Sequence, residues 1–183
     1  EFTIRAILGQ QISVKAATTL AQRIAEKYGT SVIETNIPYT EMTKHFPTPE
    51  QLKQVDYAGI RLTQSRIATL QRWVDYYLAT PDVFSKYEKI EALEETLTQL
   101  KGIGPWTVNY IAMRGLSDPD AFPSADLGII KALTINDDKP NNKTILAIAE
   151  QWRPWRAYAT IFLWQSLAII EQPKISKAPK KEK

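Results

Sequence analysis

Apolar residues recur every three to four positions through most of the chain, which is the spacing of helices that bury one face. The clearest case lies between Ser13 and Gly29. Its apolar stripe consists of Ala16, Ala17, Leu20, Ile24 and Tyr28. Ser13 is a residue type that caps helix N-termini and Gly29 one that ends helices, so we predict a helix between them.

Later segments repeat this period. Thr48 followed by Pro49 predicts a helix start, because threonine is a good N-cap and proline suits the first helical position. Further apolar stripes predict helices over residues 63–80, 90–100, 145–152 and from about residue 154 to residue 170.

Strand-like alternation is not sustained anywhere in the chain. We therefore predict an all-α fold of about eight or more helices joined by short turns. The helices form one domain of residues 1–172, in which residues 30–48 have the weakest pattern.

The stretch "LKGIGPWTVNY", residues 100–110, places two glycines and a proline where an apolar helix would otherwise continue. Gly102 and Gly104 allow a tight turn and a close approach of a large ligand to the backbone, and Pro105 suits the start of the next helix. The N–H groups of such a turn, at the positive end of a helix, can bind a phosphate. An ordinary helix stop that binds nothing explains the same residues equally well.

Composition limits the chemistry. The chain has no cysteine, which excludes disulfides, thiolate zinc sites and cysteine-ligated iron–sulfur clusters. His45 is the single histidine, so a histidine-built metal site is not expected, and we predict a surface or loop position for it. No apolar run approaches the length of a membrane span. The start "EFTIRAILG" has no signal-peptide pattern and no initiator Met, so we expect it to lie inside a longer protein, already in a helix.

The positive charge is concentrated in the last residues. Residues 173–183 contain five lysines and one glutamate, a net charge of +4, so of the formal net charge of +3 residues 1–172 carry −1. This tail has few apolar residues to bury, and we predict that it is disordered, either adding non-specific attraction to phosphates or merely solvated. A positive net charge favours nucleic-acid binding, but residues 1–172 carry no such excess, so any DNA contact they make would depend on individual groups and not on overall charge.

Four segments, in order, resemble the helix-hairpin-helix (HhH-GPD) DNA glycosylase superfamily, specifically its alkylpurine branch of the 3-methyladenine DNA glycosylase II type. They are "RAILGQQISVKAA", "LKGIGPWTVNYIAMRG", "FPSADLGIIKAL" and "WRPWRAYATIFLW". The resemblance implies an all-α fold with the active site in a cleft between two helical subdomains. Two-domain members carry a β-rich domain before this point, and we expect no such domain within the 183 residues of this chain.

The resemblance implies a monomeric enzyme of base excision repair whose partner is damaged double-stranded DNA. It implies no membrane association and no required cofactor. The enzyme acts in the cytoplasm or nucleoid of a bacterium or in a eukaryotic nucleus. It turns an alkylated purine such as 3-methyladenine out of the duplex and hydrolyses its N-glycosidic bond, leaving an abasic site. The alternatives are a non-catalytic DNA-binding module and a glycosylase for deaminated or etheno purines.

Asp126 matches the catalytic carboxylate of the family, which stabilises the oxocarbenium-like sugar or activates water. From its sequence position alone, Asp126 is a helix N-cap. The two roles are compatible, because a helix N-terminus favours an ionised carboxylate. Asp118 and Asp120 are rival carboxylates in a proline-containing turn, outside the matched position.

Trp106, Tyr110 and Trp164 match aromatic positions of the family's base pocket, where electron-rich rings attract a cationic alkylated base. Strand-cleaving relatives have a lysine at the position of Trp106; an indole cannot form their Schiff base, so this chain is expected to lack lyase activity. The remaining three tryptophans are expected in the core: Trp73, Trp152 and Trp155.

The resemblance also assigns contacts outside the pocket. Gln11 matches the wedge that fills the gap left by the flipped nucleotide, and the alternative is a plain polar residue at a helix break. The other implied DNA contacts are Gly102, Gly104 and Thr107. A monovalent cation, Na⁺ or K⁺, is implied at the backbone carbonyls of Thr98, Leu100 and Ile103.

Overall fold

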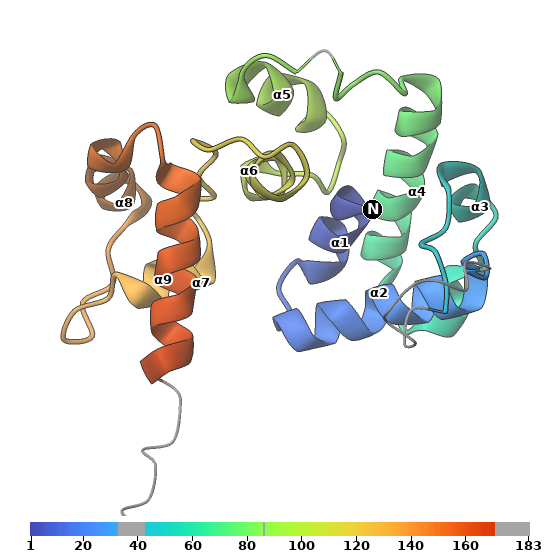
Figure 1. Ribbon diagram of the computed structural model, residues 1–183, viewed down its shortest axis with the longest axis horizontal. Coiled ribbons are helices and arrows are strands. Elements are labelled where there is room, and N and C mark those ends of the chain that lie inside the picture. The colour runs from blue at the N-terminus through green and yellow to red at the C-terminus, as the bar shows by residue number, and fades with distance from the viewer. Residues whose placement is uncertain (33–42, 86, 171–183) are drawn as a thin grey trace, which may run out of the picture. The chain divides into compact units, whose positions relative to one another are not determined.

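The computed structural model describes residues 1–32, 43–85 and 87–170, and within these ranges it contains nine α-helices, two short 3₁₀ helices and no strand (Figure 1). The all-α prediction is confirmed. The chain divides into two compact units, Glu1–Pro123 and Ser124–Lys183, each of which is described by itself.

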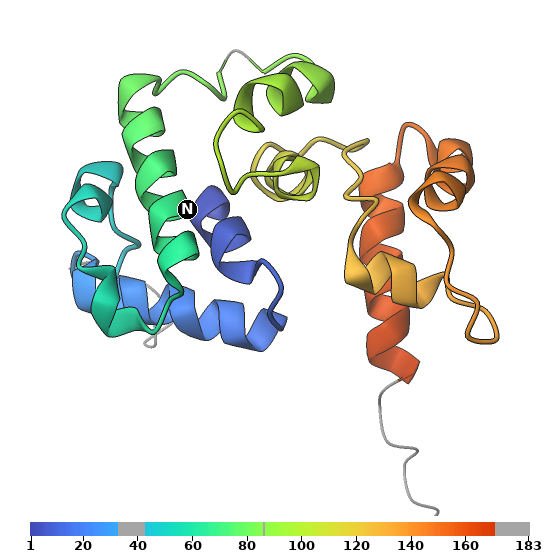
Figure 2. The same ribbon diagram turned by 180° about the vertical axis from the view of Figure 1, so that it is seen from behind.

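The first unit is built around α1, which contacts α2, α4 and α6 and is surrounded by them in both views (Figure 1; Figure 2). Ile4, Ile7 and Leu8 of α1 are almost completely buried and form the centre of the core. The helices of this unit are α1 (Phe2–Gly9), α2 (Val14–Tyr28), α3 (Pro49–Lys53), η1 (Tyr57–Ile60), α4 (Gln64–Ala79), α5 (Ile90–Leu97) and α6 (Pro105–Gly115).

The predicted helix starts are confirmed in this unit. The side chains of Ser13, Thr48 and Thr63 each accept a hydrogen bond from a backbone N–H in the first turn of the helix that follows. Gly29 ends α2 as predicted, but its φ of −75° is not left-handed. Glycine is needed there because an added Cβ would lie 2.1 Å from the carbonyl oxygen of His45.

The second unit packs α7 against α9, and α8 runs directly into η2. Its helices are α7 (Leu127–Ala132), α8 (Asn142–Ala149), η2 (Glu150–Trp152) and α9 (Arg156–Ile170). Two predicted helices differ in their bounds. The one over residues 90–100 ends at Leu97, where the hairpin turn begins, and the one over residues 145–152 starts earlier, at Asn142, and tightens into η2 after Ala149.

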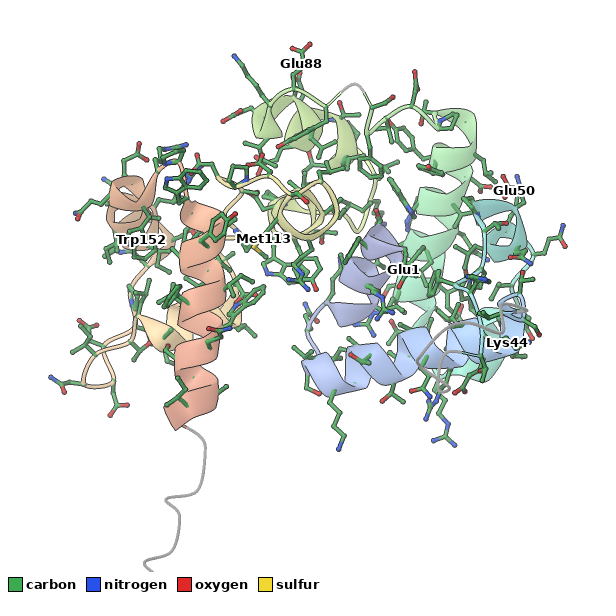
Figure 3. The ribbon with its side chains drawn as sticks, in the orientation of Figure 1. Glu1, Lys44, Glu50, Glu88, Met113 and Trp152 are labelled. Carbon is green, nitrogen blue, oxygen red and sulfur yellow. The ribbon has the colours of Figure 1, made fainter. Side chains whose placement is uncertain are left out.

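The tryptophan predictions are partly wrong. Trp73 lies in the core at 5% exposure, as expected. Trp152 is only half-buried, and Trp155 is 57% exposed, so neither is a core residue. Trp155 precedes the first turn of α9 and packs edge-on against Tyr158. The two tryptophans line an open groove of about 630 Å³ beside α9, with Trp152 next to the end of α8 (Figure 3).

His45 is exposed, as predicted. The lysine-rich tail of residues 173–183 and most of the weakly patterned segment of residues 30–48 lie outside the described residues. Of the helices described, none has the length and the apolar character needed to cross a membrane.

Candidate functional site

The hairpin between α5 and α6 uses its two glycines differently. Gly102 has a φ of +100°, and an added Cβ would lie 2.1 Å from Oγ1 of Thr69, so both the conformation and the packing require glycine. Gly104 has a φ of −112°, and an added Cβ would have no atom within 4 Å. Open space for an approaching ligand therefore exists at Gly104.

The hairpin also presents backbone donors. Ile103 donates its N–H to the carbonyl of Leu100 at 2.9 Å, which closes the turn, whereas the N–H groups of Gly102 and Gly104 make no hydrogen bond with any other described residue. Pro105 is the first residue of α6, so these donors precede the positive end of an 11-residue helix. This arrangement suits a phosphate oxygen.

Gln10, for which the sequence gives no local signal, connects the end of α1 to the hairpin. Its side-chain Nε2 donates to the carbonyl of Gly102 at 2.9 Å and to Oγ1 of Thr107 at 3.0 Å. Thr107 is 2% exposed. Its side chain is therefore occupied inside the protein, and the residue presents almost no surface for the predicted DNA contact.

Gln11 lies at the tip of the turn between α1 and α2. Ile12 donates its N–H to the carbonyl of Gly9 at 3.4 Å, and Gln10 has φ −57° and ψ 123°, while Gln11 has a φ of +59°. These values match a type II turn, whose third position favours glycine. A left-handed residue with a side chain costs roughly 1–2 kcal/mol. The structure thus holds an exposed glutamine in a conformation that it does not favour.

Trp106 and Tyr110 stack on each other along α6. Their ring centroids lie 5.3 Å apart with an interplanar angle of 25°, and both side chains are half-buried. The residues on the other face of this helix are buried in the core, including Val108 and Ile111. The pair forms an aromatic surface at the partly exposed side of α6.

The rival carboxylate Asp118 has a structural role. Its Oδ1 accepts the backbone N–H groups of Asp120 at 2.7 Å and Ala121 at 3.0 Å, and its Oδ2 accepts the hydroxyl of Tyr87. Burial, and secondarily this hydrogen bond, raises the pKa of Tyr87. Asp118 therefore organises the turn after α6.

In the second unit, Asp126 caps α7, as its sequence position predicts. Three N–H groups donate to its Oδ1: the backbone of Gly128 at 2.8 Å, the backbone of Ile129 at 3.1 Å and Nε1 of Trp164 at 2.9 Å. The carboxylate is half-buried. These three hydrogen bonds fix the orientation of the carboxylate.

Trp164 comes from α9 and lies against the first turn of α7. An added Cβ at Gly128 would lie 2.8 Å from Cδ1 of Trp164 and 2.9 Å from Oδ1 of Asp126. Glycine at this position therefore lets the indole N–H reach the carboxylate. The sequence motifs indicate Trp164, but they indicate neither this hydrogen bond nor the role of Gly128.

A family model described as "HhH-GPD superfamily base excision DNA repair protein" matches residues 4–155, a range that includes the hairpin and Asp126. The chain belongs to the HhH-GPD superfamily. The resemblance that the sequence motifs suggest is thereby confirmed.

Curated relatives of this HhH-GPD chain carry names from DNA repair. A protein of Mycobacterium tuberculosis named "Probable bifunctional transcriptional activator/DNA repair enzyme AlkA" is 37% identical over 183 residues, covering 100% of this chain and 36% of the relative. The "DNA-3-methyladenine glycosylase" of Bacillus subtilis is 34% identical over 174 residues, covering 88% and 54%. The chain thus spans about a third to a half of the length of these relatives.

Among solved structures, the 3-methyladenine DNA glycosylase Mag1 of Schizosaccharomyces pombe, in complex with abasic DNA, has a TM-score of 0.76 and 26% identity to this chain. The match covers 94% of this chain and 82% of that protein. The described helices therefore follow the fold of the superfamily.

Proposed function

We propose that this chain is the catalytic part of a monofunctional DNA glycosylase that removes alkylated purines such as 3-methyladenine from double-stranded DNA. The observation that carries the proposal is the carboxylate of Asp126, held by three N–H donors at the start of α7 within the range of the family match. The names of the relatives support the lesion class.

The first unit supplies the DNA contacts in this proposal. The N–H groups of Gly102 and Gly104 bind a backbone phosphate, which gives affinity without sequence preference. The side chain of Gln11 enters the duplex and occupies the space that the flipped nucleotide leaves. The positive φ of Gln11 supports this role, because strained exposed residues gather at sites of function.

The aromatic pair of Trp106 and Tyr110 receives the flipped base. A purine alkylated at a ring nitrogen carries a positive charge, and each aromatic contact with a cation contributes about 0.5–2 kcal/mol. The same charge makes the base a good leaving group, so the reaction needs no general acid.

In the chemical step, the C1′–N bond breaks and its electron pair leaves with the base, so that the sugar develops positive charge. The negative carboxylate of Asp126 stabilises the positive charge that develops on the sugar. A water molecule then forms the new C1′–O bond and gives up a proton, for which the carboxylate is an acceptor. The product is an abasic site, and the strand stays intact because Trp106 has no amine to form a Schiff base.

The same proposal places a monovalent cation at three backbone carbonyls that follow α5 in the hairpin, those of Thr98, Leu100 and Ile103. The carbonyls of Thr98 and Ile103 accept no hydrogen bond from the rest of the described chain, and that of Leu100 accepts one from Ile103. Na⁺ or K⁺ bound by these three oxygens would stiffen the hairpin. No step of the reaction depends on it.

The direct test is to incubate the protein with duplex DNA treated with a methylating agent and to identify the released bases by chromatography. Release of 3-methyladenine without strand cleavage supports the proposal. Release of hypoxanthine or etheno-adenine from matched substrates in its place would change the lesion class, and binding without release from any substrate would favour a non-catalytic module.

A further inference from the structure

We propose that Gln10 is a positioning residue that sets the distance between the two DNA-contacting turns of the first unit. The inference rests on the proposed function, because it assigns the phosphate contact to the hairpin and the wedge to Gln11. Gln10 belongs to the turn between α1 and α2, whereas the acceptors of its side-chain amide belong to the hairpin and to the first turn of α6.

The geometry makes Gln10 a direct connection. One nitrogen, Nε2, donates to the carbonyl of Gly102 at 2.9 Å and to Oγ1 of Thr107 at 3.0 Å, so both of its protons are used on the hairpin and the first turn of α6. Gln10 and Gln11 are the two central residues of the type II turn. A shift of the hairpin therefore displaces Gln10, which directly precedes the proposed wedge residue Gln11.

The helix α4 holds the same two turns from one side. Its Arg66 donates from Nη2 to the backbone carbonyl of Gln10, and its Arg72 donates from Nη1 to the carbonyl of Lys101 at 2.9 Å. Thr69, between these arginines on α4, fills the space that the missing side chain of Gly102 leaves. The guanidinium groups thus fix each turn on α4, and the side chain of Gln10 fixes the turns to each other.

This connection has a mechanistic consequence. Phosphate binding at the hairpin places the wedge at a set distance along the duplex, so binding energy from an undamaged part of the DNA orients Gln11 for insertion. Without the side-chain amide of Gln10, the hairpin still presents its N–H groups, but the turn that carries Gln11 loses its direct hydrogen bonds to the hairpin and keeps the one from Arg66 of α4. Affinity should therefore change little, whereas flipping and excision should fall.

The test uses Gln10→Met, which keeps the length and much of the volume of the side chain and removes both hydrogen bonds. Gln22→Met is the matched control, since Gln22 is exposed about two turns into α2 and its amide bonds only Glu26. Measured quantities are the affinity for undamaged duplex, the fluorescence of 2-aminopurine beside the lesion as a readout of flipping, and the single-turnover excision rate.

For Gln10→Met we expect an affinity within about threefold of the unmodified protein, together with a roughly 10- to 100-fold loss of flipping and excision, the size expected for a misplaced group. Unchanged flipping and excision would overturn the inference. Equal losses of affinity and excision would also overturn it, because they would show that the amide merely stabilises the hairpin.

A second pair of variants covers the case in which Gln10→Met does not fold. Thr107→Val keeps the buried shape but removes one acceptor of the Gln10 amide, and Thr107→Ser restores the hydroxyl. Loss of flipping in the valine variant with recovery in the serine variant supports the connection, and equal flipping in both contradicts it. Failure of the proposed function looks different, because the unmodified protein would then release no base.

Discussion

The two hairpin glycines allow the proposed phosphate contact to be tested apart from folding. Gly104→Ala places a methyl group where no atom lies within 4 Å, at a φ of −112° that alanine adopts freely. The lower chain entropy of alanine in the unfolded state favours folding by about 0.4–1 kcal/mol. Gly104 is the N-cap of α6, where alanine is less favourable by a similar amount, about 0.5–1 kcal/mol, so the free energy of unfolding should stay nearly constant.

Gly102→Ala should behave differently. A side chain at a φ of +100° costs about 1–3 kcal/mol in strain. In addition, its Cβ would lie 2.1 Å from Oγ1 of Thr69, so Thr69 must move. For a protein of this size each kcal/mol lowers Tm by roughly 2–4 °C, so the Gly102 variant should melt several degrees below the Gly104 variant.

DNA affinity should show the effect of Gly104→Ala most clearly. A hydrogen bond from an N–H group to a charged phosphate contributes about 1.5–3 kcal/mol, so blocking it should weaken binding roughly 10- to 100-fold, equally for all sequences. Fluorescence anisotropy with two unrelated undamaged duplexes at one salt concentration measures this. The control is Gly59→Ala, where the new Cβ meets only the flexible end of Lys27. A folded Gly104→Ala variant that binds DNA as tightly as the control would refute the phosphate contact.

Three other predictions follow from single contacts. Trp164→Phe keeps an aromatic ring but loses the N–H that donates to Asp126, so single-turnover excision should fall about tenfold or more while DNA affinity stays constant. Burial raises the pKa of Tyr57 to about 12, so the neutral hydroxyl stabilises the fold fully below pH 10 and progressively less as the pH rises toward 12. In urea unfolding at pH 9–11.5, the free energy of unfolding should therefore fall more steeply for the unmodified protein than for Tyr57→Phe. At neutral pH the variant should be less stable by about 1 kcal/mol, because it lacks the hydrogen bond to the carbonyl of Leu52. Borohydride should trap no covalent complex between the protein and abasic DNA, because Trp106 offers no amine.

Local sequence signals predicted the helices well. The caps at Ser13, Thr48 and Thr63 act within three residues, so the sequence contains both partners of each hydrogen bond. The same holds for Asp126, whose backbone donors are its near neighbours. The prediction that Trp155 is a core residue is wrong, because α9 begins only at Arg156 and Trp155 therefore lies outside the helical spacing on which the prediction rests.

The contacts that were missed join residues far apart in the chain. Gln10 bonds Gly102 across 92 positions, and Trp164 bonds Asp126 across 38, so no local pattern could reveal either pair. Glycine at position 102 was expected from turn geometry alone, whereas its packing against Thr69 depends on how α4 docks on the hairpin. Such partners are set by tertiary packing, which the local pattern of a single sequence does not reveal.

The central claim, that the charge of Asp126 drives base excision, is tested most directly by Asp126→Asn. Asparagine caps helices as well as aspartate, and its Oδ1 can still accept all three N–H groups from Gly128, Ile129 and Trp164, so the variant removes charge with little change in structure. Single-turnover excision of 3-methyladenine and affinity for an uncleavable abasic analogue are measured on the same preparation. We predict a loss of excision of at least about 10²–10³-fold with affinity retained or increased. Near-normal excision by the folded variant would contradict the account.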